Sequence, residues 1–263
     1  MKQLMMIGFG AMGQTVLAHL PAGLSLAWVV VPERSKEKVS ALVGAHVRVI
    51  HDVAACAARP DLVIEVAGQA GVREHAAAVL QRGWDMAMIS VGALADADLA
   101  ARLDAAAASG GGSLTVLAGA VAGMDGLAAA KEGGLDSVVY RGCKSPNSWR
   151  GSHAETLIDL DAVTEKTVFF TGTAREAATL FPANANVAAT IALAGLGMDG
   201  TRVELTVDPD SQKNQHHIDA TGLFGQMSIA LAGVPLPSNP KTSTLAALSV
   251  VRACRLCLNG IKV

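Results

Sequence analysis

The sequence predicts an α/β protein with an N-terminal doubly wound parallel sheet and a C-terminal α+β domain that contains a mostly antiparallel sheet. Three observations predict this fold class. A glycine-rich turn joins a strand pattern to a helix pattern at the N-terminus. Short apolar strands then alternate with helices up to about residue 117, and the later strands alternate polar with apolar residues.

The N-terminal strand ends in Gly-Phe-Gly-Ala-Met-Gly, which has the G-x-G-x-x-G spacing. Gly8 would make the tight turn, Gly10 would admit a pyrophosphate close to the backbone, and Gly13 would let the helix pack on the strand. The free N–H groups at the start of this helix, at Ala11 and Met12, would receive the phosphates. The pattern predicts a Rossmann domain that binds NAD or NADP, and the alternative is a structural glycine turn.

The elements after the first helix, which runs to about Leu20, follow a regular order. A helix is expected at 71–82, and an Ala-rich helix with an acidic start at 96–109. Ligands bind beyond the carboxyl ends of parallel strands, so Ala67 and Gly68, at the end of one strand, are expected to line the cofactor site. The strands are predicted at Leu24–Val31, Val47–Ile50, Asp61–Val66, Met86–Val91 and Leu114–Leu117.

The end of the second strand bears on the choice of cofactor. Glu33 lies about 20 residues past the glycine turn, where NAD proteins carry an acidic residue for the ribose hydroxyls. Arg34 follows directly, and a basic residue there suits the 2′-phosphate of NADP. The sequence therefore permits either cofactor.

The pattern changes after residue 119. Helices are expected up to Lys131, at 174–180 and at 187–196, and three prolines then mark a connector before a final helix at Lys241–Leu258. The last two strands are separated tightly at Gly222, as in an antiparallel meander. The strands are predicted at Ser137–Gly142, Thr167–Thr171, Arg202–Asp208, Gln215–Thr221 and Leu223–Ile229.

These elements suggest two domains. We expect residues 1–119, joined by a returning C-terminal helix at 238–263, to form the dinucleotide-binding domain. Residues 120–237 are expected to form a catalytic and dimerisation domain. A homodimer is the expectation for the oligomeric state, because such dimers are the commonest assemblies of soluble proteins.

The composition excludes several functional classes. A net charge of −2 gives no electrostatic case for binding nucleic acid or an anionic membrane, and an aromatic content of 3% argues against base stacking. No apolar run reaches the ~18 residues of a membrane span. The N-terminal stretch imitates a signal peptide, but the glycine motif, Gln14 and His19 interrupt it, so we expect a cytoplasmic protein.

The four cysteines do not suggest a disulfide framework. Cys254 and Cys257 have C-x-x-C spacing within the predicted final helix, among apolar neighbours. Two thiols alone cannot complete a zinc site, so buried packing is favoured over redox or metal chemistry. No metal is expected.

The densest polar cluster of the second domain surrounds two adjacent histidines, His216 and His217. On a strand these side chains point to opposite faces, so they do not form a metal pair. One of them can face an active-site cleft, while the other faces solvent or the core.

Several stretches resemble the L-aspartate dehydrogenase family, over nearly the whole chain. They are GFGAMG at 8–13, EVAGQ at 65–69, SVGAL at 90–94, AGAVAG at 118–123, FPANANVAAT at 181–190, NQHHIDATGLFG at 214–225 and NPKTS at 239–243. The resemblance implies NAD(P)-dependent oxidation of L-aspartate through iminoaspartate to oxaloacetate and ammonia. It also implies that released iminoaspartate can feed NAD biosynthesis.

The same resemblance implies roles for particular residues. The family pattern N-x-H-x-I places the catalytic histidine on His216, and the nicotinamide-side contacts fall on Ala120 and Asn186. A histidine can take a proton and activate water, and an amide can fix the nicotinamide carboxamide. The chain departs from the family at Lys144-Ser145-Pro146, where relatives often carry Lys-Pro-Pro.

Aspartate has two carboxylates, which cations or helix N-termini must receive. The candidates are Lys144, Arg150 and the expected helix start at Lys241 and Thr242, and the alternative for each is a surface cation or a helix cap. Two other functions stay open. One is an imine reductase like dihydrodipicolinate reductase. In that enzyme a lysine-containing stretch follows the paired histidines, whereas here Ile218-Asp219-Ala220 follows His216-His217. The other is a non-catalytic NAD(P)-binding sensor.

Overall fold

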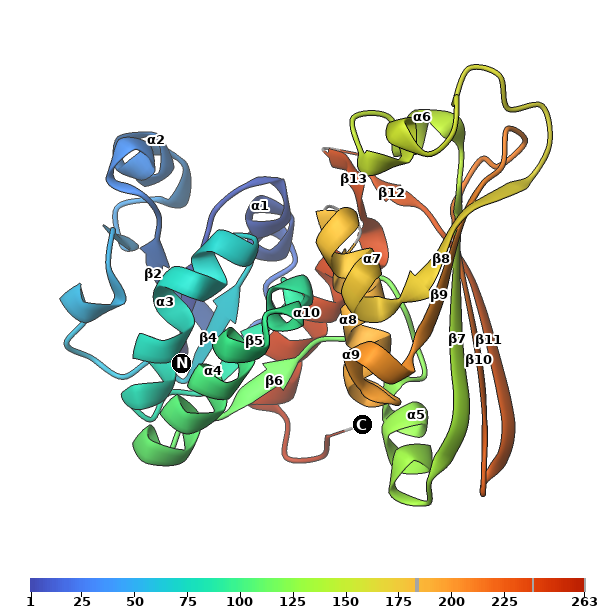
Figure 1. The fold of residues 1–263 in the computed structure, drawn as a ribbon. Coiled ribbons are helices and arrows are strands. Elements are labelled where there is room, and N and C mark those ends of the chain that lie inside the picture. Colours follow the sequence, from blue (N-terminus) through green and yellow to red (C-terminus); the bar gives the residue numbers. More distant parts are fainter. Residues whose placement is uncertain (183–184, 238, 263) are drawn as a thin grey trace. The chain divides into compact units, whose positions relative to one another are not determined.

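The computed structural model describes residues 1–182, 185–237 and 239–262. The chain forms two compact units, and each is described by itself (Figure 1). The first contains Met1–Leu117 and Ala247–Val263, and the second contains Ala118–Ala246.

The first unit is built on a six-stranded sheet with the order β3-β2-β1-β4-β5-β6. All of its pairings are parallel, which confirms the predicted doubly wound sheet. The central strand β1 is buried from Leu4 to Ile7, as expected for a strand with helices on both faces. The strands are β1 (Lys2–Ile7), β2 (Leu24–Val30), β3 (Arg48–Ile50), β4 (Leu62–Glu65), β5 (Met86–Met88) and β6 (Leu114–Val116).

In this unit, helix α4 has a capping side chain at its N-terminus and a glycine at its C-terminus. The side chain of Asp96 caps α4 by accepting a hydrogen bond from the N–H of Leu99, and Gly111, in the left-handed conformation, ends that helix. Near the C-terminus, the backbone carbonyl of Cys257 accepts a 2.6 Å hydrogen bond from Lys2 of β1. The helices are α1 (Ala11–Ala18), α2 (Glu33–Val43), η1 (Val53–Ala55), α3 (Gln69–Gln81), η2 (Val91–Ala95), α4 (Ala97–Gly110) and most of α10 (Thr244–Leu258).

The second unit is built on a five-stranded sheet with the order β11-β10-β7-β9-β8. The pairing of β7 with β9 is parallel and the other pairings are antiparallel, so the predicted mostly antiparallel sheet is confirmed. The strands are β7 (Leu135–Lys144), β8 (Thr167–Thr173), β9 (Arg202–Val207), β10 (Asn214–Gly222) and β11 (Gly225–Gly233). The remaining elements are α5 (Met124–Glu132), α6 (Pro146–Trp149), η3 (His153–Thr156), α7 (Ala174–Leu180), α8 (Ala185–Ala194), α9 (Gly197–Gly200), β12 (Pro235–Leu236) and β13 (Asn239–Ser243).

The two faces of this sheet differ in burial. Helices α5, α7, α8 and α9 all lie on one side of it (Figure 1). Side chains on that side, such as Val138, Leu205 and Ile218, are buried, whereas their neighbours on the other side, such as Arg141 and Asp219, are partly exposed. The sheet therefore has a helix-covered face and an open face.

Two details of the sequence prediction are wrong. The β10–β11 turn consists of Leu223 and Phe224 rather than Gly222, because Gly222 pairs directly with Gly225, whose φ of +108° suits glycine. The segment Asn239–Ser243 is not a helix start. It is strand β13, which pairs with β12, and α10 begins only at Thr244, whose N–H donates to the carbonyl of Val234.

An aromatic cluster anchors the short helix that follows β7. Trp149 of α6 is 1% exposed, and its indole N–H donates a 3.0 Å hydrogen bond to the carbonyl of Thr206 in β9. Its ring packs edge-on against Phe169 and Phe181. The cluster fixes the backbone just beyond Lys144.

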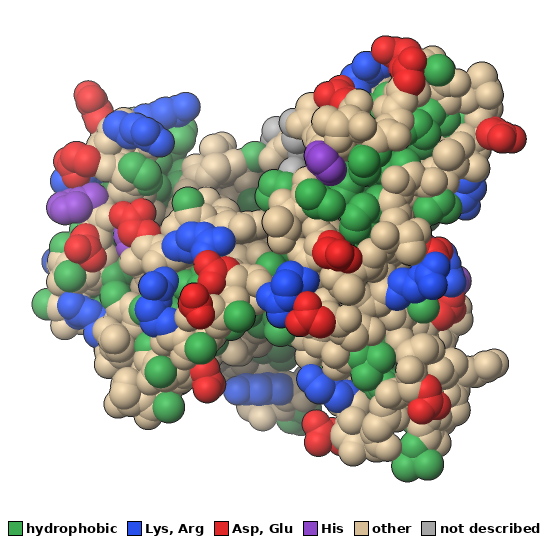
Figure 2. All heavy atoms as spheres, viewed as in Figure 1, with side chains coloured by type: hydrophobic (Ala, Val, Ile, Leu, Met, Phe, Trp, Pro, Cys, Tyr) green, Lys and Arg blue, Asp and Glu red, His purple; other side chains and the backbone are tan. Residues whose placement is uncertain are grey.

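Figure 2 shows acidic and basic side chains interspersed over the face that it presents, in keeping with the small net charge. Within the described residues, no helix is both long and apolar enough to cross a membrane.

Candidate active site

The glycine turn lies between the ends of β1 and β4. Gly8 has a φ of +91°, and a Cβ there would lie only 2.6 Å from Cα of Ala67. A Cβ at Gly13 would lie 3.0 Å from Sδ of Met6, so α1 packs closely on β1. Gly10, in contrast, faces open space: no atom lies within 4 Å of its ideal Cβ position. The turn therefore leaves room for a ligand at Gly10 and at the N–H groups that begin α1, as a dinucleotide phosphate would need.

A buried carboxylate holds the neighbouring strand ends together. Glu65, at the end of β4, is 0% exposed, and its Oε1 accepts hydrogen bonds from the N–H groups of Ala67 at 2.7 Å and Gly68 at 2.9 Å. It also accepts bonds from the N–H of Ser90 at 3.0 Å and from its hydroxyl at 2.8 Å. Burial raises the pKa of Glu65, although these four bonds act in the opposite direction. Sequence reasoning missed this arrangement, whose residues lie within the EVAGQ and SVGAL stretches.

The residues that bear on cofactor choice begin α2, directly after β2. Glu33 and Arg34 are both exposed. The carboxylate of Glu33 lies 3.4 Å from Nζ of Lys36 and 3.3 Å from Nδ1 of His51. Because α2 begins directly after β2, Glu33 and Arg34 lie at the carboxyl end of the parallel sheet. In this fold, adenosine ribose binds at that end.

In the second unit, three polar residues lie on the helix-covered face of the sheet. His216 of β10 is 5% exposed, and its Nδ1 lies 2.9 Å from the hydroxyl of Tyr140 on β7. Lys144, at the end of the same strand, has its Nζ 5.1 Å from the centre of the Trp149 ring. The site therefore combines an imidazole, a phenol and an ammonium group.

Burial controls the charges in this group. It lowers the pKa of Lys144 to about 8. Burial, and secondly the positive charge of Lys144, lowers the pKa of His216 to about 4. At neutral pH the imidazole is neutral and Lys144 is mostly protonated, which is the combination that a base beside an anion-binding group requires.

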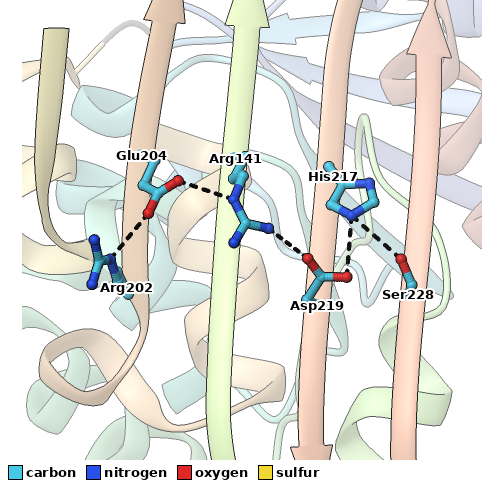
Figure 3. Close-up of polar contacts among 6 residues, drawn as sticks. All are labelled: Arg141, Arg202, Glu204, His217, Asp219 and Ser228. Carbon is cyan, nitrogen blue, oxygen red and sulfur yellow. Dashed lines mark hydrogen bonds and ion pairs between the residues drawn. The ribbon is translucent and has the colours of Figure 1, made fainter. Parts of the chain in front are cut away.

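His217 lies on the open face, which confirms that the adjacent histidines point to opposite sides. Its Nε2 lies 3.1 Å from Oδ1 of Asp219 and 3.3 Å from Oγ of Ser228 (Figure 3). Arg141 bridges Asp219 at 2.5 Å and Glu204 at 2.9 Å, so the charges form a row across neighbouring strands.

The other predicted site residues are spread over the second unit. Ala120 lies half-buried in the turn before α5, and Asn186 is exposed in the first turn of α8. Thr242 lies on β13 and accepts a 3.0 Å hydrogen bond from the side-chain amide of Asn239. Arg150 pairs with Asp161, which offsets its charge. The side chain of Lys241 lies outside the described residues.

Comparison with known proteins assigns the chain to a family. The L-aspartate dehydrogenase of Acinetobacter baylyi is 64% identical over 263 residues, which is 100% of both chains. The chain belongs to the L-aspartate dehydrogenase family. The enzyme of the same name from Serratia proteamaculans is 58% identical over 260 residues, covering 99% of this chain and 98% of the relative.

The two halves of the chain match separate family models. Residues 125–256 match the C-terminal domain of aspartate dehydrogenase, and residues 8–117 match the NAD-binding domain of homoserine dehydrogenase. The crystal structure of aspartate dehydrogenase from Thermotoga maritima supports the fold, with a TM-score of 0.79 at 23% identity over 100% of this chain and 99% of that one. The chain is thus an oxidoreductase that uses NAD or NADP, and these findings favour an enzyme over a non-catalytic sensor.

Two substitutions in the glycine turn separate its structural and binding roles. Gly8→Ala should lower the free energy of unfolding by about 2–4 kcal/mol, because the positive φ and the contact with Ala67 both oppose a side chain. Gly10→Ala should change it by less than about 1 kcal/mol, because that position is open, but should raise the Kd for NADH at least tenfold. Urea unfolding and NADH fluorescence titration measure the two effects. Wild-type NADH affinity in Gly10→Ala would contradict the predicted phosphate site.

Proposed function

We propose that the chain catalyses the NAD(P)-dependent oxidative deamination of L-aspartate, through iminoaspartate, to oxaloacetate and ammonia. The observation that carries the proposal is a buried, neutral His216 on the same sheet face as Lys144, whose positive charge acts on the imidazole. Membership of the L-aspartate dehydrogenase family supports this choice of substrate.

Amine oxidation and imine hydrolysis make separate demands on the protein. The substrate ammonium must first lose one proton, and a bound nicotinamide would supply the acceptor for the hydride that leaves Cα. His216 then takes a proton from the water that adds to iminoaspartate and returns it to the departing ammonia. Aspartate, NAD(P)⁺ and water thereby give oxaloacetate, ammonium, NAD(P)H and one proton.

The cofactor would be held mainly by backbone groups of the first unit. The open position at Gly10 and the free N–H groups of α1 fit a pyrophosphate, and Glu33 and Arg34 lie where the adenosine ribose is expected. Family resemblance supports nicotinamide contacts from Ala120 and Asn186. The full proposed set is Gly8, Gly10, Ala11, Met12, Gly13, Glu33, Arg34, Ala67, Gly68, Ala120 and Asn186.

Lys144 is proposed to receive one carboxylate of the substrate. A buried ammonium group forms stronger hydrogen bonds with a carboxylate than an exposed one does, because less water competes for it. Lys241 and Thr242 are proposed to receive the other carboxylate. In β13 Thr242 would do so through its side chain, because the segment lacks the helix N-terminus expected from the sequence.

We further propose a homodimer that forms through the open face of the five-stranded sheet, with residues 120–237 as the catalytic and dimerisation domain. Residues 1–119 with 238–263 would bind the dinucleotide. The charges on the open face alternate in sign along a row, and each already has an opposite partner (Figure 3). A second copy could therefore cover the row without leaving a charge unpaired.

Sedimentation equilibrium should give twice the mass of one chain, and a monomer mass would contradict the proposal.

Release of iminoaspartate would place the enzyme in NAD biosynthesis, in the cytoplasm. The product is a reactive imine, so a reaction that consumes it must compete with its hydrolysis. Expression of the gene in a bacterium that lacks other sources of iminoaspartate should remove its requirement for nicotinic acid. Continued dependence on nicotinic acid, despite active enzyme in the cytoplasmic fraction, would rule out this role.

The reaction itself is tested by NADH and NADPH formation with L-aspartate. His216→Ala should lower kcat about 10²–10⁴-fold, the usual contribution of a general base, and leave the Kd for NADH unchanged because the cofactor turn lies in the first unit. His46→Ala, at an exposed histidine, is the matched control and should keep wild-type turnover. Near-normal turnover in His216→Ala would overturn the role proposed for this residue.

The charge of Lys144 predicts how dicarboxylate binding depends on pH. Succinate has no amine that titrates in this range, so its inhibition constant reports the ammonium group of the protein. Because the pKa of Lys144 is lowered to about 8, the inhibition constant should rise with pH above about 8 as the charge is lost.

Lys144→Arg, which stays charged, should remove that rise, and Lys144→Met should weaken inhibition about 10- to 100-fold at pH 7. A wild-type inhibition constant that stays flat up to pH 9.5 would contradict a carboxylate-binding role for Lys144.

A further inference from the structure

Tyr140 is the chain's only tyrosine, and its side chain is almost completely enclosed. The residue is 4% exposed on the helix-covered face of β7. Its ring is nearly parallel to that of His216, with an interplanar angle of 22° and centroids 6.0 Å apart, and its hydroxyl lies 2.9 Å from Nδ1. A buried polar contact of this kind is unlike ordinary core packing, in which apolar groups fill the space.

The strand register shows how this contact is made possible. His216 of β10 lies directly opposite Gly142 of β7, whereas Tyr140 lies opposite Ile218. The tyrosine ring must therefore reach along its own strand, over position 142, to meet the histidine. A Cβ at Gly142 would lie 2.7 Å from the hydroxyl oxygen and 3.2 Å from Cζ. The absence of a side chain at Gly142 leaves the space that the phenol occupies.

We propose that Tyr140 is a positioning residue that holds Nδ1 of His216, so that Nε2 is the nitrogen that exchanges a proton with substrate and water. This inference rests on the proposed role of His216. In the form that acts as a base, Nδ1–H donates to the phenol oxygen and the lone pair of Nε2 is free. Rotation of the imidazole would break the buried bond, so the phenol fixes the orientation of the ring. By accepting from Nδ1–H, it would also stabilise the tautomer whose Nε2 is unprotonated.

A phenol suits this position better than a carboxylate would. Burial raises the pKa of Tyr140, so the hydroxyl stays neutral over the working pH range. A carboxylate in its place would stabilise the imidazolium and raise the pKa of His216, which would protonate the base. Among the described residues, Lys144 is the charged group whose field acts on His216, and it also favours the neutral imidazole.

The tautomer of the wild-type protein is the first test, and it needs no variant. In ¹⁵N NMR spectra of histidine-labelled protein, with His216 assigned by comparison with His216→Ala, Nδ1 should carry the proton and Nε2 should show the shift of an unprotonated nitrogen. A resting tautomer with the proton on Nε2 would overturn the inference.

Two substitutions then disturb the contact from opposite sides. Tyr140→Phe keeps the ring and removes the hydroxyl, and it should lower kcat about 10- to 100-fold with an unchanged Kd for NADH. Gly142→Ala keeps the hydroxyl but displaces it, and should act in the same direction. In both variants the proton of His216 should move toward Nε2, and the pH profile of kcat/KM should change. Val138→Ala, on the same face of β7, is the matched packing control and should lower stability without changing the tautomer.

The outcomes distinguish this inference from the function on which it rests. Wild-type kcat, pH profile and tautomer in Tyr140→Phe would overturn the positioning role, while an inactive His216→Ala would leave the proposed reaction standing. Near-normal turnover in His216→Ala would instead overturn the proposed role of the histidine. If Val138→Ala and Tyr140→Phe changed the tautomer equally, the Tyr140–His216 contact would have no role beyond ordinary packing.

Discussion

Successive side chains along β10 point to opposite faces of the five-stranded sheet, and this alternation separates two adjacent histidines. His216 enters the helix-covered face, where it meets Tyr140 and the field of Lys144. His217 enters the open face, where it joins the charges of Asp219 and Arg141. A shift of one residue in strand register would exchange the two environments, so the pairing of β10 with β7 determines which histidine is proposed to act on the substrate.

Charged side chains have different effects on the two faces of this sheet. On the open face the ion pairs are partly exposed, and each contributes little to stability because water screens it. On the covered face burial lowers the pKa of His216, and the ammonium group of Lys144 lowers it further, because desolvation strengthens electrostatic effects there. The chemistry proposed for the chain depends on burial more than on the number of charged residues.

A buried carboxyl group has a structural role in the first unit. Glu65 accepts hydrogen bonds from three backbone N–H groups and one hydroxyl, which joins the ends of β4 and β5 at the edge where a dinucleotide is proposed to bind. An unpaired carboxylate at 0% exposure would be strongly destabilising, and these four hydrogen bonds offset that cost. The turn at Gly8 packs directly against the backbone of Ala67, which Glu65 holds in place.

The sequence by itself determined the parallel sheet, the glycine turn, the opposite orientation of the two histidines and the resemblance to the L-aspartate dehydrogenase family. These features depend on local spacing, which can be read along the chain. Tertiary structure alone brought Tyr140 to His216, 76 residues away, and revealed why Gly142 lies between them. The sequence also misplaced the β10–β11 turn, and it predicted a helix start at Lys241 where the structure has a strand. Strand register and pairing decide these contacts, and both depend on partners distant in sequence.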